Sequence, residues 1–182
     1  MAYDFNDAQS NSGNFELIPA GTVAPMIMTI RPGAVGDGGW LTTSATSEYK
    51  WLNCEFAITD GPFRGRKIWQ NMMIEGPSEE AVNITRSTLR GILEAARGIK
   101  PADDSAEAKA KRVIANYGDF SGMEFNGKIG VEKSKSAAYP DDKNRLLGAV
   151  AGEVKASGAA PAAKKPPVSA NTNAAAKPSW AA

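Results

Sequence analysis

The chain has 182 residues, enough for one domain with a sizeable core, and its 21 Lys and Arg nearly balance its 20 Asp and Glu. That balance excludes a globally basic nucleic-acid-binding protein, so any contact with a polyanion must come from a local patch of charge. Histidine is absent, which removes the side chain best suited to proton transfer and metal binding near neutral pH and argues against an enzyme.

The N-terminal third predicts a flexible start, one strand and a long loop. Residues 1–13 are polar and rich in Gly, Asn and Ser, which indicates a flexible N-terminus. Residues 15–32 carry apolar and β-branched residues and predict one long or bent strand, with Pro19, Gly21 and Pro25 marking a bulge or an edge. The Gly/Ser/Thr stretch that follows is too long for a simple hairpin connection, and it contains Trp40.

Two strand-like runs, 51–59 and 68–74, flank the tip DGPFRGRK and predict a β-hairpin. Alternation places one set of residues toward the core: Leu52, Cys54, Phe56, Ile58, Ile68, Met72 and Ile74. Gln70 is an awkward polar member of that set, whereas Trp51 and Trp69 fall on the outward face. A register slip of one residue would exchange the two faces of the second strand.

The second half predicts two helices, two strands and a tail. Ser78 is a typical N-cap for a helix that ends near Gly98, and a shorter helix is expected from about Ser105 to Gly118. Strands are expected at 127–134 and 144–151, joined by a turn at Pro140. We therefore expect a folded domain over 14–152, followed by a disordered Ala/Pro/Lys tail over 153–182.

The expected fold is mainly β. Three strands, a helical insertion and two further strands follow the order of elements in an OB-fold, a five-stranded Greek-key barrel with a helix between strands three and four. Other small α+β sheets share that order. The OB-fold is favoured because it binds ligands on strands two and three and with the loops joining strands one to two and four to five.

Aromatic and cationic residues concentrate in those three regions. A protein that binds single-stranded nucleic acid without reading sequence needs rings for base stacking and cations along the phosphates. The predicted nucleic-acid-binding residues are Trp40, Lys50, Trp51, Arg64, Arg66, Lys67, Trp69, Lys133, Lys135, Tyr139, Lys143 and Arg145.

Three segments, FELIPAGT, DGPFRGRK with its flanking strands, and GKIGVEK followed by YPDDKNRL, resemble a phage and prophage protein family of formally unknown function. The resemblance covers about residues 15–150 and is carried by motifs in the same order. It implies an OB-like core that binds single-stranded DNA beside replication or recombination enzymes in the host cytoplasm. It adds weight to Arg66 and Lys67 of the hairpin, and to Tyr139, Lys143, Asn144 and Arg145. The long loop at 33–49 and the extra Asp in YPDDKN depart from the family pattern.

Each predicted contact also has an ordinary structural explanation. Cations at a hairpin tip discourage edge-to-edge pairing, and Trp51 and Trp69 would suit packing under the first helix. Trp40 would serve equally well as a loop anchor, and Tyr139 as a turn residue packed on the sheet.

Two other classes of function compete with DNA binding. One is a non-catalytic interaction module that recruits a recombinase or a replication factor. The other is a metal-dependent enzyme using Asp60, Glu75, Asp141 and Asp142, although these carboxylates show no recognisable ligand spacing. We expect no cofactor and no metal. We expect a cytoplasmic protein with no membrane partner, because the sequence shows neither an export signal nor a long apolar run; a homo-oligomer is compatible with this interpretation.

Overall fold

Strand β1 is the centre of a six-stranded antiparallel sheet in the computed structural model, which describes residues 16–44, 48–135, 137 and 140–150. The strands are β1 (Val23–Arg31), β2 (Thr42–Thr43), β3 (Lys50–Ile58), β4 (Lys67–Glu75), β5 (Glu124–Glu132) and β6 (Lys143–Val150). The helices are α1 (Glu79–Ala96) and α2 (Ala106–Lys111), with short 3-10 turns at Asp37–Gly39 and Tyr117–Phe120. The expectation of a mainly β fold is confirmed.

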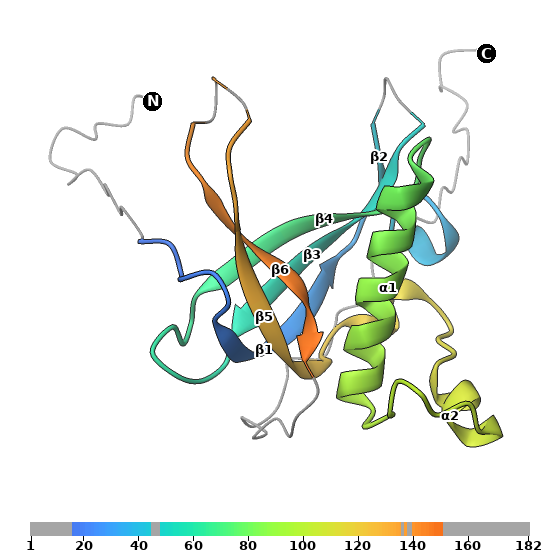
Figure 1. Ribbon diagram of the computed structural model, residues 1–182. Helices are drawn as coiled ribbons and strands as arrows, with labels where there is room; N and C mark the ends of the chain where they lie inside the picture. Colours follow the sequence, from blue (N-terminus) through green and yellow to red (C-terminus); the bar gives the residue numbers. More distant parts are fainter. Residues whose placement is uncertain (1–15, 45–47, 136, 138–139, 151–182) are drawn as a thin grey trace, which may run out of the picture.

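The sheet is curved, and its outermost long strands meet. β3 and β5 flank β1, β4 pairs with the far side of β3, and β6 pairs with β5. β4 also contacts β6, where the Gln70 side-chain oxygen accepts a hydrogen bond from the backbone N–H of Leu146 over 2.9 Å. Gln70 therefore faces inward as alternation predicted, and its side chain joins β4 to β6. The ribbon shows these two strands approaching each other (Figure 1).

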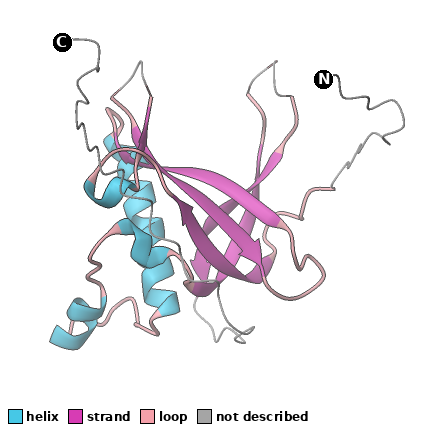
Figure 2. Cartoon of the chain, turned by 180° about the vertical axis from the view of Figure 1, so that it is seen from behind, coloured by secondary structure: helices cyan, strands magenta, loops and turns pink. Residues whose placement is uncertain are grey.

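Helix α1 covers one side of this sheet. Ser78 caps it by accepting a hydrogen bond from the N–H of Ala81, and the helix packs against β4, β5 and β6 (Figure 2). The second predicted helix is shorter than expected. α2 ends at Lys111, and a loop and a 3-10 turn take the chain to Phe120. No helix within the described part of the chain is long and apolar enough to cross a bilayer.

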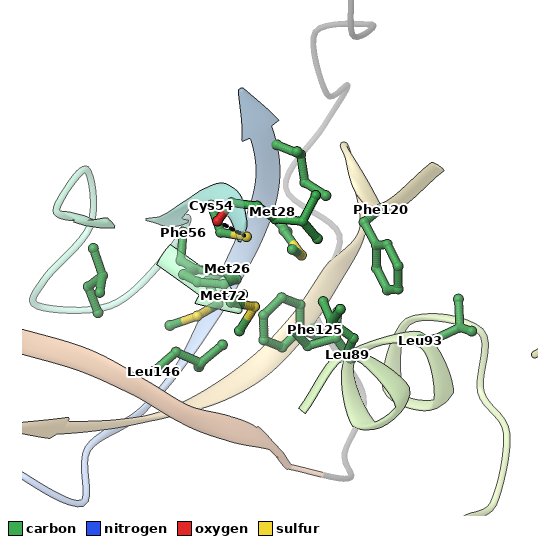
Figure 3. Close-up of a cluster of buried hydrophobic side chains, with 14 of the residues drawn as sticks. Met26, Met28, Cys54, Phe56, Met72, Leu89, Leu93, Phe120, Phe125 and Leu146 are labelled. Carbon is green, nitrogen blue, oxygen red and sulfur yellow. Dashed lines mark hydrogen bonds between the residues drawn. The ribbon is translucent and has the colours of Figure 1, made fainter. Parts of the chain in front are cut away.

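Apolar side chains from the strands and α1 form one core (Figure 3). Phe56 of β3 meets Phe125 of β5 edge to face, with ring centroids 6.1 Å apart. Leu52, Cys54, Ile58, Ile68 and Met72 are buried as well. The predicted hairpin register is confirmed, because Glu55 pairs with Trp69 and Phe56 with Ile68.

The described part of the stretch expected as a long loop at 33–49 is structured over residues 33–43. Val35 and Leu41 form a β-bridge, and β2 pairs with the start of β3. Trp40 and Leu41 are 7% and 5% exposed and belong to the core. The glycines suggested an irregular loop, but Gly36, Gly38 and Gly39 adopt positive φ angles that fold the segment back onto the sheet. The N-terminal strand is also shorter than predicted, since β1 begins only at Val23 after a turn at Ala20 and Gly21.

Candidate nucleic-acid interface

The solvent side of β1, β3 and β4 carries a group of polar and aromatic side chains that we call the Trp69 face. It consists of Arg31, Asn53, Glu55, Lys67, Trp69 and Asn71. Strand pairing sets five of these residues in two rows, and Lys67 lies beyond them, opposite Ala57. Arg31, Asn53 and Asn71 lie opposite one another across three strands, and Glu55 lies opposite Trp69 in the next row.

Glu55 is the hub of this face. One carboxylate oxygen accepts hydrogen bonds from Arg31 over 2.8 Å and from the Trp69 indole over 3.1 Å, and the other is 2.6 Å from the Lys67 ammonium. The Glu55 side chain is only 12% exposed, whereas those of Arg31 and Lys67 are about half exposed. A buried anion therefore fixes two cations and one indole that solvent can reach.

The electrostatics of Glu55 follow from these contacts. Burial alone would raise the pKa of its carboxyl group, but the hydrogen bonds from Lys67, Arg31 and Trp69 outweigh that effect and hold the pKa at about 2. Glu55 is therefore ionised at every physiological pH. The net charge of Arg31, Glu55 and Lys67 together is +1.

Trp69 is the exposed ring on this face. Its side of β4 is open, and the residue is 58% exposed even though its indole N–H is bonded to Glu55. The bond restricts how the ring can turn, so the indole is held in place without being covered. A fixed, exposed ring is what base stacking requires.

A shallow hollow of about 420 Å³ lies beside Trp69 and is lined by Arg31, Asn53, Cys54, Trp69 and Asn71. The Asn53 amide is already bonded, since it accepts from Trp51 and donates to Thr42. The exposed Asn71 amide has no hydrogen-bond partner within the described residues. An amide offers both a donor and an acceptor, so Asn71 can bond to the edge of any base.

Trp51 lies on the same side of β3 but is less available than Trp69. It is half-buried, pairs across the strand with Met73, and donates its indole N–H to Asn53 over 2.9 Å. Lys50 precedes it and forms an ion pair with Glu75 at 2.6 Å. Trp51 thus supports Asn53, and Trp69 offers the larger stacking surface.

The predicted cations of the β5–β6 hairpin form a second group. Lys133 pairs with Asp142 at 2.6 Å and Lys143 approaches Glu132 at 3.6 Å, yet their side chains are 82% and 68% exposed. Ion pairs this exposed contribute little and exchange readily for another anion. Lys135 is exposed with no ion-pair partner in the described chain. Arg145 is half-buried, and its Nε has no hydrogen-bond partner among the described residues.

Several residues of the hairpin tip at 60–66 have structural roles. Gly61 and Gly65 have φ angles of 87° and 84°, so the two glycines are needed for the turn. Phe63 packs against the core, and Arg66 donates a hydrogen bond to the backbone carbonyl of Glu16 over 3.0 Å. Arg64 is exposed without an ion-pair partner among the described residues, which leaves it available to a ligand.

The structure corrects the expectation for Trp40. Its ring is buried and lies against Gly118, where an added Cβ would overlap the indole. Trp40 is therefore a core residue and cannot stack on a base in this fold. Tyr139 lies outside the described residues.

Sequence reasoning did not single out Arg31, Asn53, Glu55 or Asn71. The alternation that placed Trp69 outward also placed Asn53, Glu55 and Asn71 on the same side, so the signal was present. Arg31 lies near the end of the strand predicted at 15–32, and its position beside Asn53 follows from a strand pairing that the chain order alone does not give.

Three of the four carboxylates considered for metal binding make other contacts, and one of these is Glu75, which is paired with Lys50. Asp60 bonds to the N–H of Gly61, and Asp142 bonds to Lys133 and to the N–H of Ser134. The part of the chain that the structure describes contains no group of three or more residues able to hold a metal ion. Burial raises the pKa of the Cys54 thiol to about 12, so its reactive thiolate is not populated at neutral pH.

Comparison with known proteins adds no family. No protein-family model matches the chain, and no curated protein matches it either.

Proposed function

We propose that the chain binds single-stranded DNA on the Trp69 face, with the cations of the β5–β6 hairpin and Arg64 adding contacts to phosphates. The observation that carries the proposal is an indole that is 58% exposed, held by a buried carboxylate and placed beside two cations. Unpaired bases can leave their own stack and lie on such a ring, whereas the bases of a duplex are already stacked on one another. The interaction needs no catalytic group.

The strand neighbours support an OB-like fold for this function. Without the two-residue β2, the order is β4, β3, β1, β5 and β6, with β4 and β6 in contact and α1 inserted between β4 and β5. An OB-fold binds ligands on its second and third strands, which correspond here to β3 and β4. The Trp69 face lies on these two strands and the neighbouring edge of β1. The motif resemblance extends the proposal to phage DNA replication or recombination.

Replacing Trp69 with alanine is expected to weaken binding of a labelled oligo-dT by about 1–3 kcal/mol, or roughly 5- to 150-fold, because one stacked base loses its partner. Fluorescence anisotropy measures the affinity, and circular dichroism checks the fold. Ile84→Ala is the matched control, since Ile84 is 54% exposed on α1, and it should bind normally. Equal affinity of the wild type and Trp69→Ala would remove Trp69 from the site, and no binding of oligo-dT at low salt would refute the function.

Replacing Glu55 with glutamine is expected to steepen the salt dependence of DNA binding. Gln keeps an acceptor for the Trp69 indole but releases Arg31 and Lys67 from their shared anion. Each cation that then contacts a phosphate should add about 0.7 to the magnitude of the slope of log K against log salt. Oligo-dT titrations between low and moderate salt measure this slope.

Glu107→Gln provides the matched control for charge, because Glu107 is 77% exposed on α2 and, among the described residues, pairs only with Lys111. It makes the same change in net charge and should leave the slope almost unaltered. If both variants steepen the slope equally, the effect is one of overall charge, and the Trp69 face is not the place where phosphates bind.

A further inference from the structure

A hollow beside α1 is separate from the Trp69 face. Its volume is about 710 Å³, within the range of ligand-binding clefts. It lies between α1, the end of β4 and the segment from Arg112 to Phe120. Ile74 lines it from the inward side of β4, opposite to the side that carries Trp69.

The floor of this α1 hollow is apolar. Leu89 and Leu93, one helical turn apart, and Phe120 line it and are at most 5% exposed. Tyr117 and the partly buried Ile114 continue the apolar wall. The surface is mainly aliphatic and offers little flat, exposed aromatic area, so it suits aliphatic or aromatic side chains of a protein better than nucleobases.

Three arginines line the same hollow, but they are not equivalent. Arg112 is 13% exposed, bonds to Glu94 over 2.7 Å and to the carbonyl of Asp103 over 2.6 Å, and also reaches the carbonyls at Lys100 and Pro101. It therefore ties the segment after α1 to the helix. Its donors are used within the fold.

Arg86 and Arg90 are available to a ligand. They lie one turn apart on the same side of α1 and are both exposed. Arg90 donates its Nε–H to Glu94 and a terminal N–H to the Pro101 carbonyl over 3.4 Å, and its other N–H groups have no partner among the described residues. Arg86 has no hydrogen bond or ion pair in the described chain.

The nearest acidic residues offset the charge of these arginines only in part. Arg90 is ion-paired with Glu94, and Glu79 lies in the hollow that adjoins Arg86. Glu75 and Glu79 line an adjoining hollow together with Arg86, but Glu75 is already paired with Lys50 at 2.6 Å. Glu94 is 6% exposed and is shared by Arg90 and Arg112. An apolar floor with a cationic rim matches a ligand that combines bulky apolar groups with carboxylates.

We propose that the α1 hollow binds an acidic peptide segment of a partner protein, with one or two large apolar side chains on Leu89, Leu93 and Phe120 and neighbouring carboxylates on Arg86 and Arg90. The two sites lie on opposite sides of β4, so the partner and a DNA strand can be bound together. The proposal goes beyond DNA binding and does not depend on it.

The test uses the full chain and fluorescein-labelled peptides, followed by anisotropy. The probe is Glu-Asp-Leu-Phe-Glu-Asp, and the controls are Lys-Lys-Leu-Phe-Lys-Lys and Glu-Asp-Ala-Ala-Glu-Asp. Only the first should bind measurably at concentrations up to about 1 mM. No binding of the probe, or equal binding of the probe and either control, overturns the proposal. So does binding of decanoate without binding of the probe, which would indicate a small amphipathic anion as the ligand.

Two charge reversals separate this site from the DNA site. Arg86→Glu should weaken peptide binding at least tenfold and leave oligo-dT binding unchanged, because it places a like charge against the peptide. Arg64→Glu should do the opposite, weakening oligo-dT binding and sparing the peptide. Both residues are exposed and make no ion pair in the described chain, so both variants should fold.

Competition and mass measurements complete the test. Saturating oligo-dT should leave the affinity for the peptide unchanged. Displacement of the peptide by oligo-dT would mean that the hollow is part of the nucleic-acid-binding site, and it would overturn the proposal. Light scattering of the wild type and Arg86→Glu tests whether a second copy of the chain occupies the hollow instead. A dimer that Arg86→Glu converts to monomers would assign the hollow to a second copy of the chain, again against the proposal.

Discussion

Replacing Trp40 with alanine is expected to lower the free energy of unfolding by about 3–5 kcal/mol, the usual loss for a large aromatic side chain deleted from a core. Trp40 is 7% exposed and packs with Leu41 and against Gly118. The deletion leaves a cavity between the segment at 33–43 and the 3-10 turn at Tyr117–Phe120. Urea denaturation monitored by circular dichroism measures the loss, and the melting temperature should fall by about 10 °C.

Trp69→Ala is the matched control, because it deletes the same ring from an exposed site. Its cost should stay below about 2 kcal/mol, since it loses mainly the hydrogen bond to Glu55. The two variants should therefore affect different properties. Trp40→Ala should lower the stability of the fold, and Trp69→Ala should lower the affinity for DNA. A stable Trp40→Ala protein with impaired oligo-dT binding would contradict the core assignment and restore Trp40 as a ligand contact.

The hairpin of β3 and β4 could be derived from the sequence because its information is local. Strict alternation from Leu52 to Ile58 fixes one face, and the short turn at 60–66 leaves few ways to align the second strand. Burial of one face then specifies the register, since a slip of one residue would expose Ile68 and Met72. The N-cap of α1 at Ser78 was predictable for the same reason, because capping depends on neighbours in the chain.

The segment at 33–43 could not be derived in this way. Its glycines and threonines are typical of a loop. Trp40 contacts Gly118, and because the two residues are 78 positions apart in the sequence, neither one predicts the contact. A large ring in a polar stretch is equally compatible with an exposed ligand contact and with an anchor. Tertiary packing decides between them, and here it favours the anchor.

The candidate site was half predictable. Parity along β4 placed Trp69 on the outward face, but the role of Glu55 depends on Arg31 arriving from β1 on one side and Lys67 from β4 on the other. A glutamate in an alternating strand gives no sign that three donors surround it. The sequence singled out Lys67, but it singled out neither Arg31 nor the Glu55 carboxylate that binds both cations.

An anion at the centre of a face proposed to bind phosphates is unfavourable for affinity, so the presence of Glu55 needs a physical reason. Glu55 reduces the local charge, but it also holds the Trp69 indole in place and prevents Arg31 and Lys67 from repelling each other. A ring and two cations that are ordered before the strand arrives lose less conformational freedom on binding. Glu55 thus weakens the attraction of the face for phosphates, but it orders the ring and the two cations before binding and stabilises the fold.

Replacing Glu55 with glutamine is expected to remove about 2–3 kcal/mol of stability at pH 7 and to make that loss depend on pH. The folded-state pKa of Glu55 is about 2, below the value of 4.5 for a free glutamate side chain. A lowered pKa stabilises the fold fully above the unfolded value, and the stabilisation is lost as the pH falls toward the folded value. The full shift corresponds to about 3 kcal/mol, and solvent screening of the half-exposed Arg31 and Lys67 reduces it somewhat.

Urea denaturation of the wild type and Glu55→Gln at pH 7, 5, 4 and 3 tests this expectation. Glutamine mimics the protonated acid, so the difference between the two proteins should be constant from pH 7 to 5 and fall by about half at pH 3. Glu107→Gln, which alters an exposed pair on α2, should change stability by no more than about 0.5 kcal/mol. If the loss of unfolding free energy in Glu55→Gln is the same at every pH, Glu55 acts by packing alone. The proposal that its charge orders Trp69 for a nucleic-acid strand would then have to be abandoned.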